Sequence, residues 1–325
     1  MPRALSAAVL ACAFVAPVGA AAQTYPIRPV TMVISFAAGS SIDVVGRIIA
    51  PRLSELLGQQ VVVENVTGAA GIIGNSRVAK SAPDGYQFVL GATGGFAQNQ
   101  SLYKNLPYNA ATDFAPVALL AETPPVLVAR KDLPADTLTQ FIAYTKANQA
   151  KMQYGSSGAG TSTHLACVLL NAAIGVKVTH IPYRGGGPAM QDLIAGRIDY
   201  QCPLSAVTIP QIASKVVKAI AILTKERSKI LADVATAHEQ GLTDFDAGSW
   251  FAFFLPKGTP APVVQKLNAA TIATLETPPV QQRLFENGAT VVALERRSPQ
   301  YLQKFVESEI AKWAAAIKAA GVQID

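Results

Sequence analysis

The stretch Val30-Thr-Met-Val-Ile-Ser-Phe-Ala-Ala-Gly-Ser-Ser-Ile-Asp-Val-Val-Gly-Arg-Ile-Ile-Ala-Pro-Arg-Leu-Ser-Glu-Leu-Leu-Gly-Gln-Gln-Val-Val-Val-Glu64 decides the fold of this chain. Residues 30–36 form a short apolar run rich in β-branched side chains, which is typical of a buried strand. Apolar residues then recur at helical spacing until Gly58, a residue type that commonly ends a helix. Residues 60–64 again have the composition of a strand. The pattern therefore predicts a βαβ unit with two parallel strands.

The turn inside this unit, Phe36-Ala-Ala-Gly-Ser-Ser-Ile-Asp43, has a counterpart in Tyr154-Gly-Ser-Ser-Gly-Ala-Gly-Thr-Ser-Thr-His164. Each turn follows an apolar run and precedes a helical stretch. Backbone N–H groups and small hydroxyls at a helix N-terminus form a ready site for an anion. Two such turns in one chain suggest a clamp for a small carboxylate.

Strand, turn and helix patterns alternate along the rest of the chain, which indicates an α/β fold with two lobes. One strand is expected at 86–90, followed by a small-residue turn at 91–95. Two crossings between the lobes are expected near 121–126 and 245–250, where they would form a hinge. The expected divisions are a signal peptide at 1–22, a first lobe at 23–122 and 249–325, and a second lobe at 123–248.

The composition is that of a well-packed globular protein. Of the 325 residues, 50% are hydrophobic and 15% are charged, which argues against intrinsic disorder. The net charge is +6, but only 7% of the residues are aromatic and the basic residues form no long run, so no nucleic-acid partner is expected. A modest positive charge helps to attract a small anion.

The N-terminus has the pattern of an export signal. Arg3 precedes an apolar stretch at 4–18, and the small residues Ala20 and Ala22 suit cleavage before Gln23. The apolar stretch is short for a membrane span. We therefore expect a periplasmic protein, cleaved near Ala22, with Cys12 in the discarded segment; lipid modification of Cys12 is the alternative.

Two cysteines, Cys167 and Cys202, belong to the mature chain. In an oxidising compartment such a pair tends to form a disulfide, and only one intramolecular pairing is possible. Two buried free thiols are the alternative, because unpaired cysteines are often buried.

Eight segments then form a recognisable series: Tyr25-Pro-Ile-Arg-Pro29, Pro83-Asp-Gly-Tyr86, Leu106-Pro-Tyr108, Asp113-Phe-Ala-Pro-Val117, the turn at 154–164, His180-Ile-Pro-Tyr-Arg-Gly185, Ser249-Trp-Phe251 and Pro256-Lys-Gly-Thr-Pro-Ala-Pro262. In this order they resemble the Bug-type extracytoplasmic solute receptors, the substrate-binding components of tripartite tricarboxylate transporters. The resemblance extends over essentially the whole mature chain.

This resemblance implies a two-lobed periplasmic binding protein of the type II-like, Venus-flytrap kind, in which each lobe is a mixed sheet flanked by helices. It implies a receptor that closes on a small organic carboxylate, with no enzymatic activity and no cofactor. A monomer is expected. Its partners would be two integral membrane subunits of the transporter, one large and one small.

The resemblance also places the ligand between the two Gly/Ser turns, with the segments around 91–94, at 183–185 and after Cys202 completing the cleft. Arg184 is the expected charged partner of the ligand, since a guanidinium group can bind a carboxylate in bidentate fashion. No metal site is expected, because the histidines show no ligand spacing. The expected ligand-binding residues are Ser35, Phe36, Ala38, Gly39, Ser40, Ser41, Thr93, Gly94, Gly155, Ser156, Ser157, Gly158, Thr161, Ser162, His164, Tyr183 and Arg184.

Two departures from the family pattern bear on the ligand. The first turn usually reads Pro-Ala-Gly-Gly, whereas this chain has Ala37-Ala38-Gly39-Ser40. Many relatives carry aspartate where this chain has Pro203, and proline offers neither a side-chain acceptor nor an N–H group. This disfavours an amino-acid ligand and favours simple mono- or dicarboxylates, including aromatic ones.

Other functions fit the motifs less well. The 155–164 turn fails as a nucleotide loop, because Thr161 stands where a P-loop needs lysine. A Ser/His hydrolase with Ser157 or Ser162 beside His164 is a distant alternative, since no Gly-x-Ser-x-Gly elbow is present. A nearer alternative is a ligand-sensing periplasmic module that signals to a membrane sensor kinase. Asp43 is expected to stabilise the first turn of its helix rather than to contact the ligand.

Overall fold

The computed structural model describes residues 25–321, so the predicted signal peptide and Cys12 lie outside the described residues. Between residues 25 and 321, no helix combines the length and the apolar character needed to cross a membrane.

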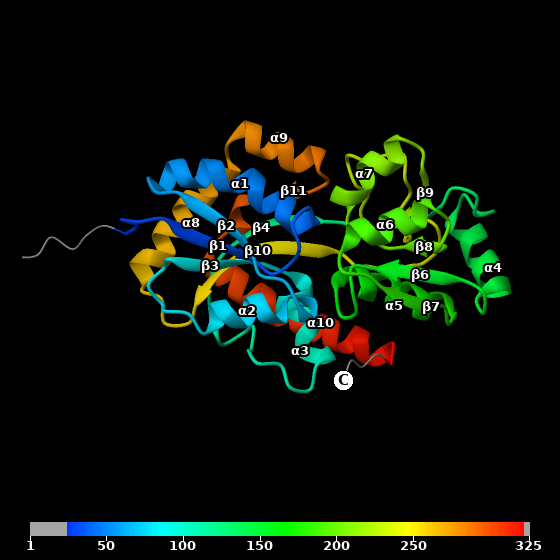
Figure 1. Cartoon of the computed structure of the whole chain (residues 1–325), viewed down its shortest axis with the longest axis horizontal. Coiled ribbons are helices and arrows are strands. Elements are labelled where there is room, and N and C mark those ends of the chain that lie inside the picture. Colours follow the sequence, from blue (N-terminus) through cyan, green and yellow to red (C-terminus); the bar gives the residue numbers. More distant parts are fainter. Residues whose placement is uncertain (1–24, 322–325) are drawn as a thin grey trace, which may run out of the picture.

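The chain folds into two lobes, each built on a mixed sheet with helices on both faces, which confirms the predicted fold class (Figure 1). The first sheet has the order β11-β4-β10-β3-β1-β2 and consists of β1 (Val30–Ile34), β2 (Val61–Asn65), β3 (Gln87–Ala92), β4 (Phe114–Thr123), β10 (Ser249–Pro256) and β11 (Thr290–Val291). The second has the order β7-β6-β8-β5-β9 and consists of β5 (Val126–Arg130), β6 (Gln153–Ser156), β7 (Thr179–Pro182), β8 (Tyr200–Gln201) and β9 (Val217–Ile222).

The predicted βαβ unit is confirmed. β1 pairs in parallel with β2, and Val30 lies opposite Val61. Helix α1 (Ser41–Leu57) connects the two strands and ends at Gly58, whose left-handed φ of 70° suits glycine. β1 also pairs in parallel with β3. The segments that follow these three strands therefore meet at one edge of the sheet.

Side chains on the two faces of the first sheet pack against two different layers of helices. Met32 and Ile34 pack against the layer of α1, α8 (Ala261–Leu275) and α9 (Pro278–Glu286). Val33 and Val89 pack on the opposite side with the layer of α2 (Ile72–Ala79), α3 (Asn99–Leu102) and α10 (Pro299–Ala319). Period-two alternation along a strand gives each face its own apolar set.

The second sheet is covered in the same way. Leu127 and Tyr200 pack with α4 (Leu138–Asn148) and α5 (Ser162–Ile174). Val126 and Val128 pack on the other face with α6 (Gly186–Ile194) and α7 (Ser205–Ala213).

One expected element is wrong: the segment 91–95 is not a turn. β3 continues to Ala92, and the chain then enters the π-helical segment η2 (Gly94–Gln98). Gly91 permits this course, because a Cβ atom there would lie 2.5 Å from the ring of Phe96. Two short 3₁₀ segments complete the fold, η1 (Ala69–Gly71) and η3 (Leu294–Arg296).

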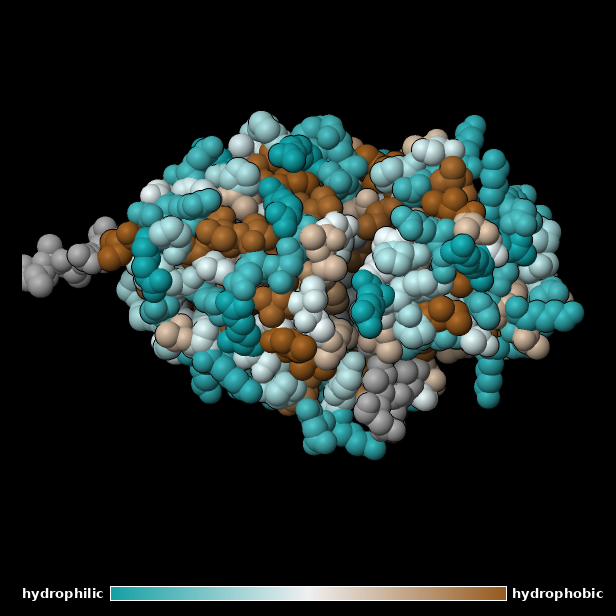
Figure 2. Space-filling model, viewed as in Figure 1, coloured by the Kyte–Doolittle hydropathy of each residue, from teal (hydrophilic) through white to brown (hydrophobic). Residues whose placement is uncertain are grey.

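The surface seen in Figure 2 is mostly hydrophilic on both lobes, with hydrophobic residues in separate patches. The large hydrophobic side chains that are exposed are scattered along the chain: Ile27, Val62, Ile73, Ile194 and Leu294. Hydrophobic residues scattered singly over a surface are normal and do not by themselves indicate an interface.

Candidate functional site

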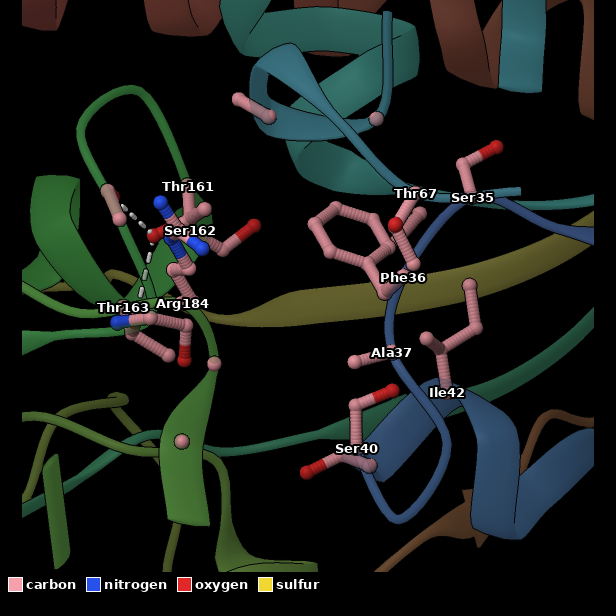
Figure 3. A pocket seen from close by; sticks show the side chains of 18 of the residues that line it. Ser35, Phe36, Ala37, Ser40, Ile42, Thr67, Thr161, Ser162, Thr163 and Arg184 are labelled. Atoms are coloured by element: carbon pink, nitrogen blue, oxygen red, sulfur yellow. Dashed lines mark hydrogen bonds between the residues drawn. The ribbon is translucent and has the colours of Figure 1, made fainter. Parts of the chain in front are cut away.

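A cavity of about 720 Å³ lies between the two lobes. From the first lobe it is lined by residues 35–42, residues 67–71 and Ala92; from the second, by residues around 157–163, residues 183–188, Leu204 and Val207. Ser249 and Phe251, at the start of β10, complete the wall. Figure 3 shows Phe36 and Ser40 facing Thr161, Ser162 and Arg184 across an open space.

The first wall is the turn that leads from β1 into α1. Gly39 has a left-handed φ of 78°, and its N–H donates to Asp43 Oδ2 over 2.8 Å. Asn65 Nδ2 donates to Phe36 O and to Asp43 Oδ1, both over 2.9 Å. These hydrogen bonds hold the turn on the side away from the cavity. The N-terminus of α1 therefore points towards the cavity.

Asp43 is therefore structural, as the sequence predicted. Its carboxylate is 3.0 Å from Arg47 Nε and does not line the cavity. Burial opposes ionisation, but hydrogen bonds from Arg47, Asn65 and the Gly39 N–H outweigh it and lower the pKa of Asp43. The negative charge thus faces Arg47 instead of an incoming anion.

The second wall is the Gly/Ser turn that leads from β6 into α5. Thr161 is the N-cap, and its Oγ1 accepts from the His164 N–H and donates to Gly158 O. The Ser157 N–H donates to Thr163 Oγ1 over 3.0 Å. Gly158 and Gly160 have φ values of 126° and 77°, which side-chain-bearing residues rarely adopt.

A third helix start, that of α6, faces the same cavity. Its N-cap is Gly185, with φ 127°, and Gly186 and Gly187 follow. Arg184 precedes them and is exposed; it has no ion-pair partner within residues 25–321. Because glycines leave the backbone accessible, the N–H groups of this helix start are open to a ligand.

Five of the predicted binding residues do not line the cavity. Thr93 is fully buried and accepts hydrogen bonds from the Trp250 N–H (2.8 Å) and Ser249 Oγ (3.1 Å). Gly155 is a ladder residue of β6, paired with Ile181 and Gln201. Side-chain burial and strand pairing at these positions follow from tertiary packing, which local sequence does not show.

Ser156, His164 and Gly94 are the others. Ser156 Oγ lies 2.7 Å from His180 Nε2 and is 1% exposed. His164 lies behind the turn, where its Nδ1 accepts from the Gly160 N–H and its ring stacks on that of His180 at 4.1 Å. Gly94 lies at the contact between the lobes, next to Ser162.

The Ser156–His180 pair is poorly suited to nucleophilic catalysis. Burial lowers the pKa of His180 to about 4. Burial, with a smaller effect of His180, lowers the pKa of His164 to about 3. Such imidazoles are weak bases at neutral pH. Within residues 25–321, no group of three or more histidine, cysteine or acidic side chains is placed to hold a metal ion.

Sequence reasoning missed the loop at 67–71, which forms part of the first wall. Ala69 and Ala70 there have positive φ values of 45° and 52°, and Gly71 lies against the ring of Phe36. Gly68 and Gly71 were the sequence signal for this loop, because repeated glycines often mark backbone that lies close to neighbouring groups. Leu204 and Val207 belong to the segment after Cys202, which the family resemblance had placed at the cleft, whereas Phe251 carried no local signal.

A disulfide joins Cys167 in α5 to Cys202, which follows β8. Cys202 is close in sequence to Leu204 and Val207, so the bond links two parts of the second wall. Pro203 does not line the cavity; its carbonyl accepts from the Val126 N–H over 2.9 Å.

Comparison with known proteins gives consistent matches. A family model described as tripartite tricarboxylate transporter family receptor matches residues 45–322. The UPF0065 protein in the TAR-I ttuE-ttuC' intergenic region of Agrobacterium vitis is 42% identical over 315 residues, which is 97% of this chain and 91% of that protein.

Solved structures agree in fold over nearly the full length. The periplasmic binding protein BugD matches with a TM-score of 0.87 and 40% identity over 92% of this chain and 99% of that one. MatC of Rhodopseudomonas palustris, with bound malate, has a TM-score of 0.86 and 38% identity over 90% and 100%. An R. palustris protein with adipate has a TM-score of 0.87 and 35% identity over 92% and 99%.

Proposed function

The chain belongs to the tripartite tricarboxylate transporter family of receptors, and from this premise we propose that it is a periplasmic receptor that captures a small organic carboxylate between its lobes for uptake. It acts as a binding protein rather than an enzyme. Its membrane partners are the large and small integral subunits of such a transporter. The lobes are residues 23–122 with 249–325, and residues 123–248.

One observation carries this proposal: the N-termini of α1, α5 and α6 converge on one cavity that holds Arg184 and, among its described wall residues, no acidic side chain. Each helix N-terminus carries a partial positive charge and unpaired N–H groups. Closure around a carboxylate would remove water and strengthen these bonds. The ligand-bearing relatives, with malate and adipate, support an organic acid as the ligand.

The contacts proposed for the ligand come from both walls. The hydroxyls of Ser40, Ser157 and Ser162 and the guanidinium group of Arg184 bind carboxylate oxygens. Phe36, Leu204 and Val207 pack against the apolar part of the ligand. This combination of polar and apolar wall residues suits a ligand with a carbon skeleton between or beside its charged groups.

Calorimetric titration with a panel of mono-, di- and tricarboxylates tests the proposal. A thermal-shift screen of the same panel precedes it, because a ligand that binds only the folded protein raises the melting temperature. We expect at least one panel member to bind and to reduce the radius of gyration in small-angle scattering, as lobe closure requires. A folded receptor that binds no panel member would contradict the proposal.

A further inference from the structure

Gln98 is a buried amide without partners. Its side chain is 1% exposed, and neither Oε1 nor Nε2 forms a hydrogen bond with any residue from 25 to 321. Burying a polar group without a partner costs free energy, and native proteins rarely leave both ends of an amide unpaired. Such a group points to an interaction that another state of the protein completes.

The amide lies at the contact between the lobes. Gln98 ends η2, the segment that follows β3 in the first lobe. A Cβ atom placed on Gly94 would lie 3.6 Å from Gln98 Oε1, 3.2 Å from Ser162 Oγ and 3.6 Å from Ser162 N. The amide of the first lobe and the first residue of α5 in the second lobe thus approach the same point.

Ser162 is a fitting partner. It is the first residue of α5, so its backbone N–H is one of the groups that a helix leaves unpaired. Its hydroxyl forms no hydrogen bond within the described part of the chain, and the residue lines the cavity. Figure 3 shows Ser162 at the inner edge of the second wall. Ser162 Oγ can accept a hydrogen bond from Gln98 Nε2 while its hydroxyl proton is donated to the ligand.

We propose that Gln98 is a positioning residue for lobe closure: when the cleft closes, its Nε2 donates a hydrogen bond to Ser162 Oγ, which fixes the N-terminus of α5 against the first lobe, aimed at the ligand. This inference rests on the proposed function. The bond is made in the closed state and not in the present one, so it adds to the preference of the liganded protein for closure. Gln98 acts on the ligand through α5 and does not itself line the cavity.

A double-mutant cycle with Gln98→Met and Ser162→Ala tests the pairing, with adipate and malate as probes. Loss of one neutral hydrogen bond is expected to weaken binding about three- to tenfold in Gln98→Met, and Ser162→Ala should weaken it more, because the Ser162 hydroxyl also binds the ligand. In the double variant, Gln98→Met should add less than about twofold to the effect of Ser162→Ala, because the acceptor of the proposed bond, Ser162 Oγ, is already absent. The unliganded Gln98→Met protein should be at least as stable as wild type, since an unpaired buried amide has been removed.

Thr145→Val is the matched control. Thr145 in α4 is fully buried, and its hydroxyl has no partner within residues 25–321. α4 lies at the end of the second lobe that faces away from the first (Figure 1). This substitution also removes an unpaired buried group, and it should leave the affinity unchanged.

Two outcomes would overturn the inference while leaving the proposed function intact: Gln98→Met binds the probes as tightly as wild type, or the two single effects multiply in the double variant. Gln98→Leu replaces Gln98→Met in the cycle if the latter does not fold. A wild-type receptor that binds neither the probes nor any other panel carboxylate overturns the proposed function and this inference together.

Discussion

Arg184 is the one charged side chain among the described residues of the cavity wall. Asp43, the nearest acid in sequence to the first turn, is held by Arg47 and Asn65 behind the wall. The electrostatic character of the cavity therefore comes from one guanidinium group and three helix N-termini. The partial charges of the helix N-termini belong to the backbone and cannot be removed by substitution, whereas the charge of Arg184 can.

Arg184→Gln should weaken carboxylate binding about three- to tenfold, because an exposed ion pair contributes about 1 kcal/mol. The effect should be smaller at high salt, since salt screens exposed charges. Titration calorimetry at low and high salt measures both. Arg197→Gln is the control, because Arg197 is exposed in the same lobe and pairs with Asp192 instead of facing the cavity. Equal affinities of wild type and Arg184→Gln at low salt would contradict this assignment.

The stacked pair His164 and His180 should make the protein sensitive to acid. Their pKa values, about 3 and about 4, lie below the value of about 6.5 in an unfolded chain. Between pH of about 6.5 and about 4 the unfolded chain binds protons that the folded chain does not. Stability is therefore full above this range and falls as the pH decreases through it, by at most about 1.4 kcal/mol per pH unit for each proton.

Urea unfolding of wild type and His180→Gln across this pH range measures the effect. The variant should show a shallower loss of stability on acidification, because one of the two titrating groups is gone. Thr145→Val, a change at a buried residue that does not titrate, should keep the wild-type slope. Identical slopes for wild type and His180→Gln would show that other groups control the acid response.

At the scale of elements, strand ends and helix starts build the cleft. β1, β2 and β3 run parallel, so the segments after them lie together. In the second lobe, β6 pairs in parallel with β7, which brings the starts of α5 and α6 to one edge. Ligands of open α/β sheets lie outside the carboxyl ends of strands for this geometric reason.

Gly91→Ala should destabilise the protein by about 2 kcal/mol, because the new Cβ atom would collide with two aromatic rings. It would lie 2.5 Å from Phe96 and 3.0 Å from Phe254, whose rings stack at 4.0 Å. Since Phe96 belongs to η2, ligand affinity should fall as well. Urea unfolding and calorimetry measure the two effects.

Gly196→Ala is the control for this substitution. Gly196 has a positive φ but open space around the Cβ position, so the cost is confined to the backbone, about 1 kcal/mol. Its affinity should equal that of wild type. The packing argument would be contradicted if Gly91→Ala were as stable as Gly196→Ala.

At the scale of the whole molecule, hydrogen bonds from side chains hold the two segments that pass from one lobe to the other. At the first crossing, Ser205 Oγ lies 2.9 Å from Thr123 Oγ1 and 2.8 Å from Gly288 O. At the second crossing, Thr93 Oγ1 accepts hydrogen bonds from Ser249 Oγ and from the Trp250 N–H on one side. From the other side, Glu309 in α10 accepts from the indole N–H groups of Trp250 and Trp313.

Lys312 adds an ion pair to the hydrogen bonds at the second crossing. Its Nζ lies 3.2 Å from Asp246, the residue that also accepts from the Gly248 N–H. Helix α10 of the first lobe is thereby bonded to the last residues before β10. We therefore expect the hinge to lie in the backbone at 124–125 and near 248, because these short crossings are bordered by hydrogen-bonded side chains and would permit rotation about a narrow axis.

Thr93→Val should lower the free energy of unfolding by about 1–3 kcal/mol, because it leaves the buried Trp250 N–H without its acceptor. Affinity should also fall a few-fold, since Ser249 in the cavity wall loses its partner. Thr145→Val makes the same chemical change where no bond is lost, so it should not destabilise. Equal unfolding free energies for the two valine variants, measured in urea, would contradict the role given to Thr93.

The sequence by itself determined the family, the α/β class with two lobes, the βαβ unit and the end of its helix at Gly58. These features depend on local physics: periodicity and the left-handed freedom of glycine. The structural turns of the site belong to this group, because each is encoded in a few adjacent residues.

Only the tertiary structure decided which side chains line the cavity. Thr93, Ser156 and His164 have the residue types of a binding site, yet neighbours from distant segments bury them or occupy their polar groups. The loop at 67–71 and Phe251 line the cavity through the meeting of strands far apart in sequence. Exposure to a cleft is a property of packing between elements, and a local pattern of residues does not contain it.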